Sequence, residues 1–367
     1  MRVKCKKEEL IKNVAAVQRA VSGRSTLPIL NNILVDAKGE KIRLVATDLE
    51  IGIEALLPAI VQKEGIVTFP AKYFLEIVRH LPGEEVEIYL EKGTQIHIQS
   101  EKAHFTMSGL SAEEFPLLPE IKDGTTLKIG QKDLQETIEK TTFACSKDET
   151  TRPELSGVLL LISEDKIQAV ATDGNRLALK ELEWRSGTTA KQELLIPSRA
   201  LDELLRILPD GEEELEIIVG NNQVDFQLSA KKLITRKIQN RFPNWEQVIP
   251  KEFQMTFLVE TARLQEALDR CLLLARLVNN RVRLQGEGAN FVLSTSVPEV
   301  GSVEEELSWT KGEGSIDMGF NVRFLIEGVR NIKTEHTFLG YTGKERPLVL
   351  RPSDEKGFLY LAMPLRT

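Results

Sequence analysis

The stretch AVATDGNRLAL, residues 169–179, is an apolar run that ends in a glycine-containing turn. Residues 44–54, LVATDLEIGIE, contain the same ATD triplet, which begins at residue 46 in one copy and at residue 171 in the other. Short apolar runs bounded by turn residues predict strands. The repeated triplet indicates either a pair of catalytic aspartates, Asp48 and Asp173, or a repeated fold. Only the later copy continues with the residues GNR.

Two kinds of segment occur three times along the chain. Segments of the first kind pair a short apolar strand with an amphipathic helix: VKCKKEELIKNVAAVQRAVS from residue 3, LKIGQKDLQETIEKTTFACS from residue 127 and FLVETARLQEALDRCLLLAR from residue 257. Segments of the second kind add a turn and a strand: TFPAKYFLEIVRHLPGEEVEIYL from residue 68, LIPSRALDELLRILPDGEEELEIIV from residue 195 and GFNVRFLIEGVRNIKTEHTFLGY from residue 319. A period this long predicts tandem domains.

Each third of the chain is therefore predicted to contain two βαβββ halves, which makes the fold class α+β. The first two thirds close with EFPLLPEI and RFPNWEQVIP, where pairs of prolines mark the exits. These exits place the three domains at residues 1–121, 122–250 and 251–367. A chain of 367 residues with 41% hydrophobic content is long enough for several cores.

Composition restricts the class of protein. No apolar run is long enough to span a bilayer, and the N-terminus has no apolar signal core, so we expect a cytoplasmic protein. The three cysteines, Cys5, Cys145 and Cys271, lack metal-ligand spacing, which fits a reducing compartment. The net charge of −7 argues against a generally basic nucleic-acid binder but does not describe how charge is distributed. No metal site and no cofactor is predicted.

Helices of the second kind carry basic residues in one common register. When they are aligned on Phe74, Leu201 and Leu325, apolar residues stand four and seven positions later, and bases stand two positions before and five after. At about 100° per residue, the bases lie roughly 150° from the apolar stripe, on the outward face. The apolar residues are Val78, Leu81, Leu205, Leu208, Val329 and Ile332, and the bases are Lys72, Arg79, Arg199, Arg206, Arg323 and Arg330.

Two interpretations of these bases remain open. One is a solvated helix face, since Glu76, Glu203 and Glu327 each follow the leading base by four residues and can pair with it. The other is a surface that faces nucleic acid, because each helix keeps two bases for one acid at these positions. The first helix adds Lys12 and Arg19. Contacts to nucleic acid would then go to phosphates, independently of sequence.

Little in the sequence supports an active site. The strand FVLSTSVPEVG, from residue 291, aligns with the ATD strands but ends without an aspartate, and a carboxylate that leaves a strand usually closes a turn. The four histidines are dispersed, and no Walker A, dinucleotide-binding glycine, HExxH or CxxC motif occurs. We therefore predict a protein that is not an enzyme. The alternatives are an enzyme that uses Asp48 and Asp173, and a protein-only scaffold.

Seven motifs give the chain a family resemblance. They are LPILNNILV (27–35), ATDLE (46–50), MSGLSAEEFPLLP (107–119), RPELSGVLL (152–160), ATDGNRLA (171–178), RFPNWEQVIP (241–250) and MPLR (363–366). In this order, over essentially the whole chain, they resemble the bacterial DNA polymerase sliding clamp family, the beta subunit of DNA polymerase III. The resemblance implies a processivity factor: a head-to-tail homodimer of three clamp domains per copy that encircles duplex DNA, with helices lining the ring and sheets outside. It also implies a nucleoid-associated location.

The resemblance implies roles for particular residues at the DNA and dimer surfaces. The outward bases would face DNA without sequence preference, and Arg24 would be a further DNA contact. At the dimer interface, Phe105 and Met107 of one copy would meet Leu273 and Leu274 of the other. The accompanying charged groups would be Lys102 and His104 against Glu304, Glu305 and Glu306. His104 stands where a permanent cation is expected.

The resemblance also implies a pocket for partner peptides between the second and third domains. Its partners would be the DNA polymerase III catalytic subunit, the clamp loader, other DNA polymerases and repair proteins. The matching residues are Leu155, Thr172, Gly174, Asn175, Arg176, Leu177, Pro243, Val248, Asn321, Phe324, Leu361, Met363, Pro364, Leu365 and Arg366. Gly174 would allow close approach of a chain, Arg176 would offer a fixed donor, and Met363 would adapt to different partners. The departures from the family pattern are Phe324, Gln247 and Thr367.

Overall fold

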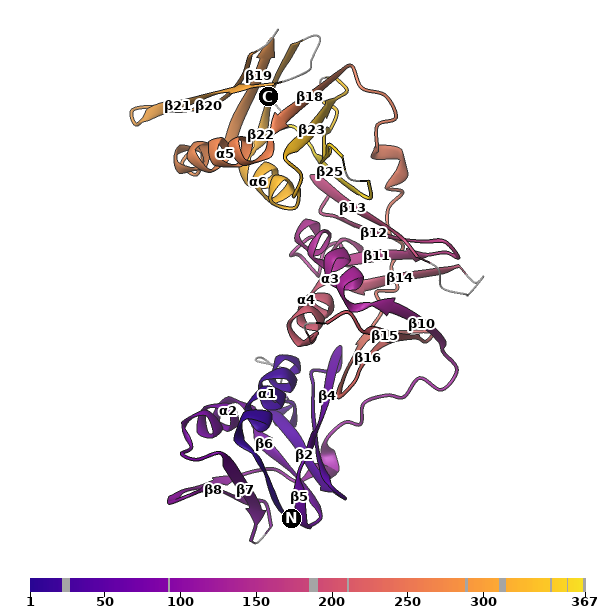
Figure 1. The fold of residues 1–367 in the computed structure, drawn as a ribbon, viewed down its shortest axis with the longest axis vertical. Helices are drawn as coiled ribbons and strands as arrows, with labels where there is room; N and C mark the ends of the chain where they lie inside the picture. Colours follow the sequence, from indigo (N-terminus) through magenta and orange to yellow (C-terminus); the bar gives the residue numbers. More distant parts are fainter. Residues whose placement is uncertain are drawn as a thin grey trace. The chain divides into compact units, whose positions relative to one another are not determined.

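The computed structural model describes residues 1–21, 27–91, 93–184, 191–209, 211–287, 290–309, 315–343, 345–354 and 356–365. The chain forms two compact units (Figure 1). The first comprises Met1–Lys132 and Arg199–Lys237, and the second comprises Asp133–Ser198 and Ile238–Thr367. The middle third of the sequence therefore contributes to both units, so the units do not coincide with the three thirds of the repeat.

The first unit contains two antiparallel sheets. Its strands are β1 (Arg2–Lys6), β2 (Asn32–Lys38), β3 (Lys41–Thr47), β4 (Ile51–Pro58), β5 (Ile60–Lys63), β6 (Gly65–Pro70), β7 (Glu85–Leu90), β8 (Gln95–Ser100), β9 (Ala103–Ser108), β10 (Thr125–Gly130), β15 (Glu214–Val219), β16 (Gln223–Leu228) and β17 (Lys231–Arg236). One sheet has the order β5-β1-β7-β8-β9, and the other has the order β10-β15-β16-β17-β4-β3-β2-β6.

The second unit also contains two antiparallel sheets. Its strands are β11 (Gly157–Ile162), β12 (Lys166–Thr172), β13 (Arg176–Glu183), β14 (Gln192–Pro197), β18 (Met255–Glu260), β19 (Arg281–Glu287), β20 (Asn290–Val297), β21 (Gly301–Ser308), β22 (Ser315–Asn321), β23 (His336–Tyr341), β24 (Leu348–Pro352) and β25 (Phe358–Ala362). The sheet orders are β14-β11-β12-β13-β25-β24-β23-β18 and β21-β20-β19-β22.

Amphipathic helices bury their apolar stripes against these sheets. The helices are α1 (Lys7–Val17), α2 (Ala71–His80), α3 (Gln131–Glu139), α4 (Ser198–Ile207), α5 (Thr261–Ala275) and α6 (Val322–Arg330). Short 3₁₀ turns are η1 (Gln18–Ala20), η2 (Pro28–Asn31), η3 (Ala112–Glu114), η4 (Thr142–Ala144), η5 (Pro153–Leu155) and η6 (Glu246–Val248). In α1 the side chains of Leu10, Val14 and Val17 are fully buried, and their spacing is that of one helical face. Burying one such side chain stabilises the folded state by about 1.5–3 kcal/mol.

The element order confirms the predicted repeat. Each third of the chain runs strand, helix, three strands, and then the same again, with β5 as an additional strand in the first third. The two eight-stranded sheets arise because the last strand of one third pairs with a strand of the preceding third. These junctions are β17 with β4 and β25 with β13, both antiparallel. The same rule leaves β9 and β21 unjoined, and both are edge strands.

Candidate functional site

The first ATD triplet, at the end of β3, closes a turn. The Asp48 Oδ1 atom accepts hydrogen bonds from the backbone N–H groups of Glu50 at 3.0 Å and Ile51 at 2.8 Å. The Thr47 hydroxyl donates to the Ile51 carbonyl at 2.9 Å and accepts from the Leu49 N–H at 3.0 Å. Short polar side chains that bond to nearby backbone groups in this way fix turns. Asp48 therefore has a structural task in its own loop.

The second ATD triplet, at the end of β12, closes the same turn with the same bonds. The Asp173 Oδ1 atom accepts from the N–H groups of Asn175 at 2.8 Å and Arg176 at 3.1 Å. The Thr172 hydroxyl donates to the Arg176 carbonyl at 2.5 Å and accepts from the Gly174 N–H at 3.1 Å. The identical bonding in two copies identifies the triplet as a remnant of the repeated fold.

Leu49 holds a backbone conformation that side chains rarely adopt. Its φ is 78°, where the second copy has Gly174 with a φ of 90°. A side chain in this region costs about 1–2 kcal/mol, a cost that glycine avoids. We expect Leu49→Gly to raise the free energy of unfolding by about 1 kcal/mol. This would be seen as a higher thermal midpoint for the first unit, which contains Leu49. Gly174→Ala is the matched opposite change and should lower the midpoint of its own unit. Midpoints that move in the same direction for both variants would contradict the shared turn.

The three cysteine thiols are buried. Burial raises the pKa of the Cys5 thiol to about 12 and that of the Cys271 thiol to about 11, so both stay protonated at neutral pH. Cys145 is buried as well, and none of the three forms a disulfide. Among the described residues, no group of three His, Cys, Asp or Glu side chains could hold a metal ion. No helix in that part of the chain is long and apolar enough to cross a membrane.

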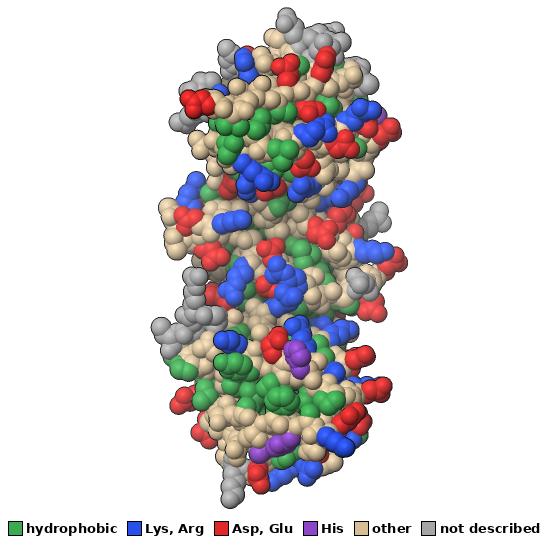
Figure 2. Space-filling model, turned by 90° about the vertical axis from the view of Figure 1, so that its left-hand side faces the viewer, with side chains coloured by type: hydrophobic (Ala, Val, Ile, Leu, Met, Phe, Trp, Pro, Cys, Tyr) green, Lys and Arg blue, Asp and Glu red, His purple; other side chains and the backbone are tan. Residues whose placement is uncertain are grey.

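The bases predicted to point outward are exposed. In α2 the apolar side chains of Phe74 and Val78 are fully buried, while Lys72 and Arg79 face solvent. The other predicted bases, Lys12, Arg19, Arg199, Arg206, Arg323 and Arg330, are also exposed. Figure 2 shows that Lys and Arg side chains on this face of each unit lie among Asp and Glu rather than in one unbroken patch. Arg24 lies outside the described residues.

Helix α4 departs from the predicted apolar stripe. Leu201 is buried as predicted, but Leu205 and Leu208 are only half-buried. Leu204 and Ile207, one residue earlier in each case, are buried in their place. The buried stripe therefore keeps Leu201 but is displaced by one residue at its two later positions. The leucine-rich sequence offers apolar residues at both registers, so packing and not spacing selects between them.

The acids of α2 and α4 pair differently from the prediction. Glu76 and Glu203 bind the base that follows them by three residues: Arg79 at 3.4 Å and Arg206 at 2.6 Å. In α4 the base four residues earlier, Arg199, binds Asp48 at 2.6 Å and not Glu203. Exposed ion pairs contribute only about 0.2–1 kcal/mol. Such a base can therefore exchange its carboxylate partner for a phosphate at little cost.

Residues predicted for the peptide pocket come together in the second unit from three distant segments. Strands β13 and β25 pair with Leu177 opposite Leu361. Beyond the strands, the Met363 N–H donates to the Asn175 carbonyl at 2.8 Å. The Leu365 N–H donates to a carbonyl of β22 at 2.8 Å. These bonds hold the C-terminal segment beside the turn that carries Gly174.

The predicted pocket residues differ in exposure. Gly174, Asn175, Val248 and Met363 are exposed; Pro243, Asn321, Phe324, Pro364 and Leu365 are half-buried; Leu155, Thr172, Arg176, Leu177 and Leu361 are buried. Arg366 lies outside the described residues. The groups that an incoming chain could touch directly are therefore those of the first two classes, above all Val248, 48% exposed, and Met363, 36% exposed.

A hydrophobic cluster supports these exposed side chains. It consists of Leu159, Val170, Leu177, Leu179, Leu195, Phe242, Trp245, Val349 and Leu361, with Leu161, Ile238, Ile249, Phe253 and Leu359 packed against it. Leu177 and Leu361, predicted as pocket walls, thus belong to the core of the unit. Sequence reasoning missed Phe242 and Trp245, although both stand in the RFPNWEQVIP motif that closes the second third.

Arg176, predicted as a donor for a partner, uses its donors inside the protein. Its Nε donates to Asp173 Oδ2 at 2.9 Å, one terminal nitrogen donates to the Phe143 carbonyl at 2.7 Å, and the other binds Glu327. The guanidinium carbon also lies 4.6 Å from the centroid of the Phe324 ring. With 8% of its surface exposed, Arg176 holds α6 and the turn together. Arg176 is therefore a positioning residue inside the unit, and its contact with a partner stays a prediction.

The side chains predicted for a dimer interface lie on the edge strand β9 and on the helix α5. On β9, Phe105 is 39% exposed and Met107 is half-buried. On α5, Leu273 is 66% exposed and Leu274 is half-buried. β9 is the last strand of its sheet, so one row of its backbone groups faces outward. Exposed apolar side chains beside an open strand edge are typical of an interaction surface.

Of the three acids predicted to face the partner, Glu305 is already engaged. Its two carboxylate oxygens each accept a hydrogen bond from Arg270 of α5 at 2.7 Å, and the arginine holds the pKa of Glu305 below its usual range. Glu305 therefore faces the helix. Since side chains alternate along a strand, Glu304 and Glu306 face the opposite side, where both are exposed.

Three family models match the chain in succession: the N-terminal domain of the DNA polymerase III beta subunit at residues 1–119, its central domain at 128–244 and its C-terminal domain at 246–366. The chain belongs to this family. The beta sliding clamps of Staphylococcus aureus (strain Mu50) and Staphylococcus epidermidis are each 32% identical to it over 372 residues, covering 99% of the chain and 98% of the relative.

Solved structures of family members agree with this fold. The DNA polymerase sliding clamp of Bacillus subtilis matches with a TM-score of 0.95 at 30% identity, over 100% of the chain and 99% of that structure. The beta subunit from DNA polymerase of Streptococcus pyogenes matches with a TM-score of 0.94 at 26% identity, over 100% of both chains. The predicted family and the three tandem clamp domains are confirmed. As a beta subunit, the chain is a clamp that gives the replicative polymerase processivity.

Proposed function

We propose that two copies of this clamp close head to tail into a ring around duplex DNA and carry DNA enzymes along it. Strand pairing supports the closure. Inside each chain, β17 joins β4 and β25 joins β13, and the same rule applied once more joins β9 of one copy to β21 of another. Such a contact uses different surfaces on the two copies, and head-to-tail contacts of this kind form rings when the rotation closes.

In this proposal the clamp holds DNA through its exposed helix bases. Phosphate contacts are independent of sequence and individually weak, so they allow sliding, while the closed ring prevents escape. The clamp itself catalyses no reaction in this proposal; the aspartates of the two ATD triplets close turns, and the buried thiols of Cys5 and Cys271 stay protonated. Its task is mechanical. We place this activity in the cytoplasm, at the nucleoid.

Partner proteins would dock at the exposed part of the second unit formed by Gly174, Val248 and Met363. The candidates are the DNA polymerase III catalytic subunit, the clamp loader, other DNA polymerases and repair proteins, each presenting an apolar peptide. The proposal keeps the domain limits near Ile121 and Pro250, where the prolines stand. Phe324 packs under Arg176, so it shapes this surface through its ring.

A topological test separates a ring from a protein-only scaffold. We expect the clamp, loaded by a clamp loader onto nicked circular DNA, to stay bound through gel filtration at moderate salt. Cutting the circle should release it within the time of the experiment, because retention comes from closure and not from contact strength. Linear DNA with both ends blocked by bound protein is the control and should retain the clamp. Persistence on the cut, unblocked DNA would rule out the ring.

A further inference from the structure

Two histidines touch each other at the free edge β9. The Nδ1 atom of His97, on β8, lies 3.1 Å from the Nε2 atom of His104, on β9. His97 is buried with 7% exposure, whereas His104 is exposed. The other nitrogen of His97 lies 3.5 Å from the carboxylate of Glu91. A proton on that nitrogen leaves Nδ1 as an acceptor, so we assign the shared hydrogen bond as a donation from His104 to His97.

The surroundings hold this pair in place. The Tyr89 ring lies parallel to that of His97, with centroids 4.8 Å apart, and its hydroxyl is 3.3 Å from His104 Nε2. The Thr106 hydroxyl is 3.2 Å from His97 Nδ1. The charged groups near the pair are Glu91, Arg2 over the Tyr89 ring at 5.4 Å, Glu87 bound to Arg2 at 2.8 Å, and the exposed Glu101 and Lys102 of the β8–β9 turn.

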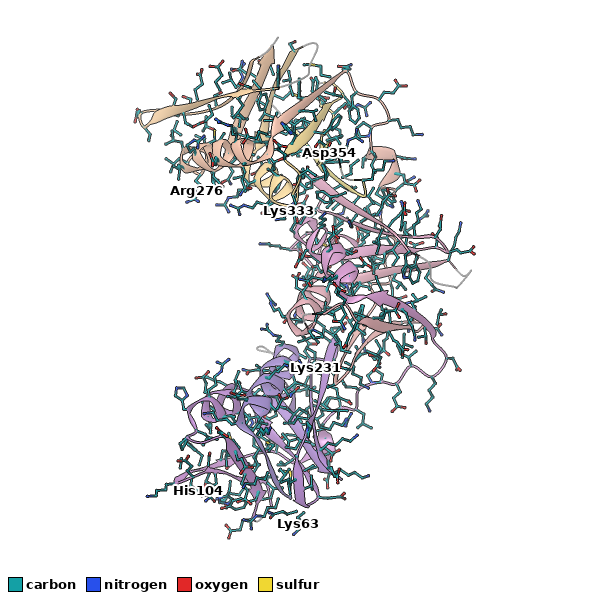
Figure 3. The ribbon with its side chains drawn as sticks, viewed as in Figure 1. Lys63, His104, Lys231, Arg276, Lys333 and Asp354 are labelled. Carbon is teal, nitrogen blue, oxygen red and sulfur yellow. The ribbon has the colours of Figure 1, made fainter. Side chains whose placement is uncertain are left out.

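The junction between β17 and β4 shows what the corresponding position does inside the chain. Lys232 lies directly opposite Glu54, with Nζ and a carboxylate oxygen 3.8 Å apart. Its neighbour Lys231 lies beside α1 (Figure 3), where burial and Lys12 lower the pKa of Lys231. Because side chains alternate along a strand, Lys232 and Glu54 face away from the helix. A charge pair thus crosses the outer face of this junction.

His104 occupies the position of Lys232 in the equivalent hairpin. β17 begins with Lys231, which pairs with the last residue of β16, and β9 begins with Ala103, which pairs with the last residue of β8. His104 and Lys232 are each the next residue along. Phe105 lies opposite the buried Ile98, so His104 is on the outer face, as Lys232 is. Figure 3 labels His104 at this free edge.

The matching acids stand on β21. Glu305 faces α5 through its bonds to Arg270, which leaves Glu304 and Glu306 on the face away from the helix. That is the same kind of face on which Glu54 meets Lys232. Joining β9 of one copy to β21 of another therefore brings His104 to Glu304 and Glu306, a complementary arrangement of charge when the imidazole is protonated.

We propose that the contact between two copies of this clamp is linked to protons through His104. The inference rests on the proposed ring. The protonated ring of His104 pairs with Glu304 and Glu306 of a second copy while donating its Nε2–H to neutral His97. The Nδ1 atom of His97, 3.1 Å from His104 Nε2, accepts this hydrogen bond.

Dimer stability is expected to fall as pH rises, because the dimer stabilises the protonated ring of His104. Association places carboxylates beside His104, so the dimer takes up a proton, and its added stability is present at low pH and lost as pH rises through the range in which imidazole titrates. Lysine stays charged throughout this range, so the Lys232 junction does not respond.

The test measures the dimer dissociation constant of the full-length clamp by sedimentation at about pH 6 and about pH 8, at fixed ionic strength. We expect the wild type to dissociate about 2- to 5-fold more readily at the higher pH, the effect of one exposed ion pair. His104→Lys should stay tight at both values, and His104→Gln should stay weak at both. Glu304→Gln with Glu306→Gln should remove the pH dependence from the other side.

Controls keep the outcomes distinct. His80→Gln changes another exposed histidine of the same unit, on α2, and should keep the wild-type pH response. Circular dichroism melts at both pH values would show that each variant is folded. A dimer whose dissociation constant is independent of pH, or a pH response retained in His104→Gln, would overturn the proton linkage while leaving the ring intact. No dimer at any pH would overturn the ring and this inference with it.

Discussion

Reversing the charge at Arg79, Arg206 and Arg330 together is expected to reduce the affinity for duplex DNA by roughly 100-fold or more. The slope of log affinity against log salt concentration should fall by about 3, since each lost phosphate contact removes about 0.9. The measurement is loading onto nicked circular DNA and, separately, a binding titration at several salt concentrations. The reason is that these three side chains occupy one register position on α2, α4 and α6.

Reversing the charge of these three arginines is expected to weaken DNA binding more than neutralising them would. Arg79, Arg206 and Arg330 each lie near an acid of their own unit: Glu76 at 3.4 Å, Glu203 at 2.6 Å and Asp269 at 3.3 Å. Replacing the base by glutamate leaves that acid without its counter-charge and adds a second. The helix face then repels phosphate, because like charges within a Debye length of about 8–10 Å are poorly screened.

A charge-matched control distinguishes the helix faces from net charge. Lys128, Lys166 and Arg283 are exposed bases on strands, and each lies near an acid: Glu216, Glu181 and Asp317. Reversing these three changes the net charge by the same amount but should leave DNA loading and the salt slope nearly unchanged. Equal losses in both triple variants would mean that DNA senses the overall charge and not the helix faces.

The sequence was sufficient for the architecture because the repeat leaves redundant signals. The ATD turns, the two kinds of strand–helix segment and the proline exits all recur, so one weak pattern is confirmed by another. The sequence did not show how the chain divides into compact units, since β17 pairs with β4 across more than 150 residues of sequence. Pairing over that distance is decided by complementary edges, and no local pattern records it.

Side-chain partners were harder to predict than elements. Glu305 looked equivalent to Glu304 and Glu306, but one alternation of the strand turns it toward Arg270. Arg176 looked like a free donor beside a glycine turn, but its guanidinium donates hydrogen bonds to three groups of the protein itself. Arg270 lies 35 residues from Glu305, and two of the three Arg176 partners, Phe143 and Glu327, are also distant in sequence. A long arginine side chain reaches such partners only once the fold is formed.

The two ATD turns have nearly the same backbone conformation and differ in the side chains around them. Leu49 adopts nearly the backbone angle of Gly174, so glycine is not required for the turn. What glycine provides is space: an added Cβ at Gly174 would meet only Arg152, at 3.9 Å. In the first unit, Leu118 packs over Gly52 so closely that an added Cβ there would lie 2.3 Å from it. In the first unit, Leu118 therefore covers the strand that follows the turn.

Truncating the exposed anchors of the second unit is expected to separate peptide binding from folding. Met363→Ala with Val248→Ala should weaken binding of a peptide from the clamp-contacting segment of the polymerase by about 2 kcal/mol or more, roughly 30-fold. The thermal midpoint should remain close to that of the wild type, because both side chains are substantially exposed. Val300→Ala, an exposed apolar truncation in the β20–β21 turn of the same unit, is the matched control and should bind normally.

Leu177→Ala truncates a buried side chain and is expected to lower the stability of the fold. Leu177 is 4% exposed and packs in the cluster with Phe242, Trp245 and Leu361, so its truncation should cost about 2–5 kcal/mol of stability. Any loss of peptide affinity in this variant would then be accompanied by a lower thermal midpoint, whereas the loss in the Met363 and Val248 variant would not. Isothermal titration with the peptide and a melting curve for each variant measure the two quantities independently. If the exposed pair can be truncated without loss of affinity, the peptide does not lie on this surface, since the buried leucine alone offers it no contact.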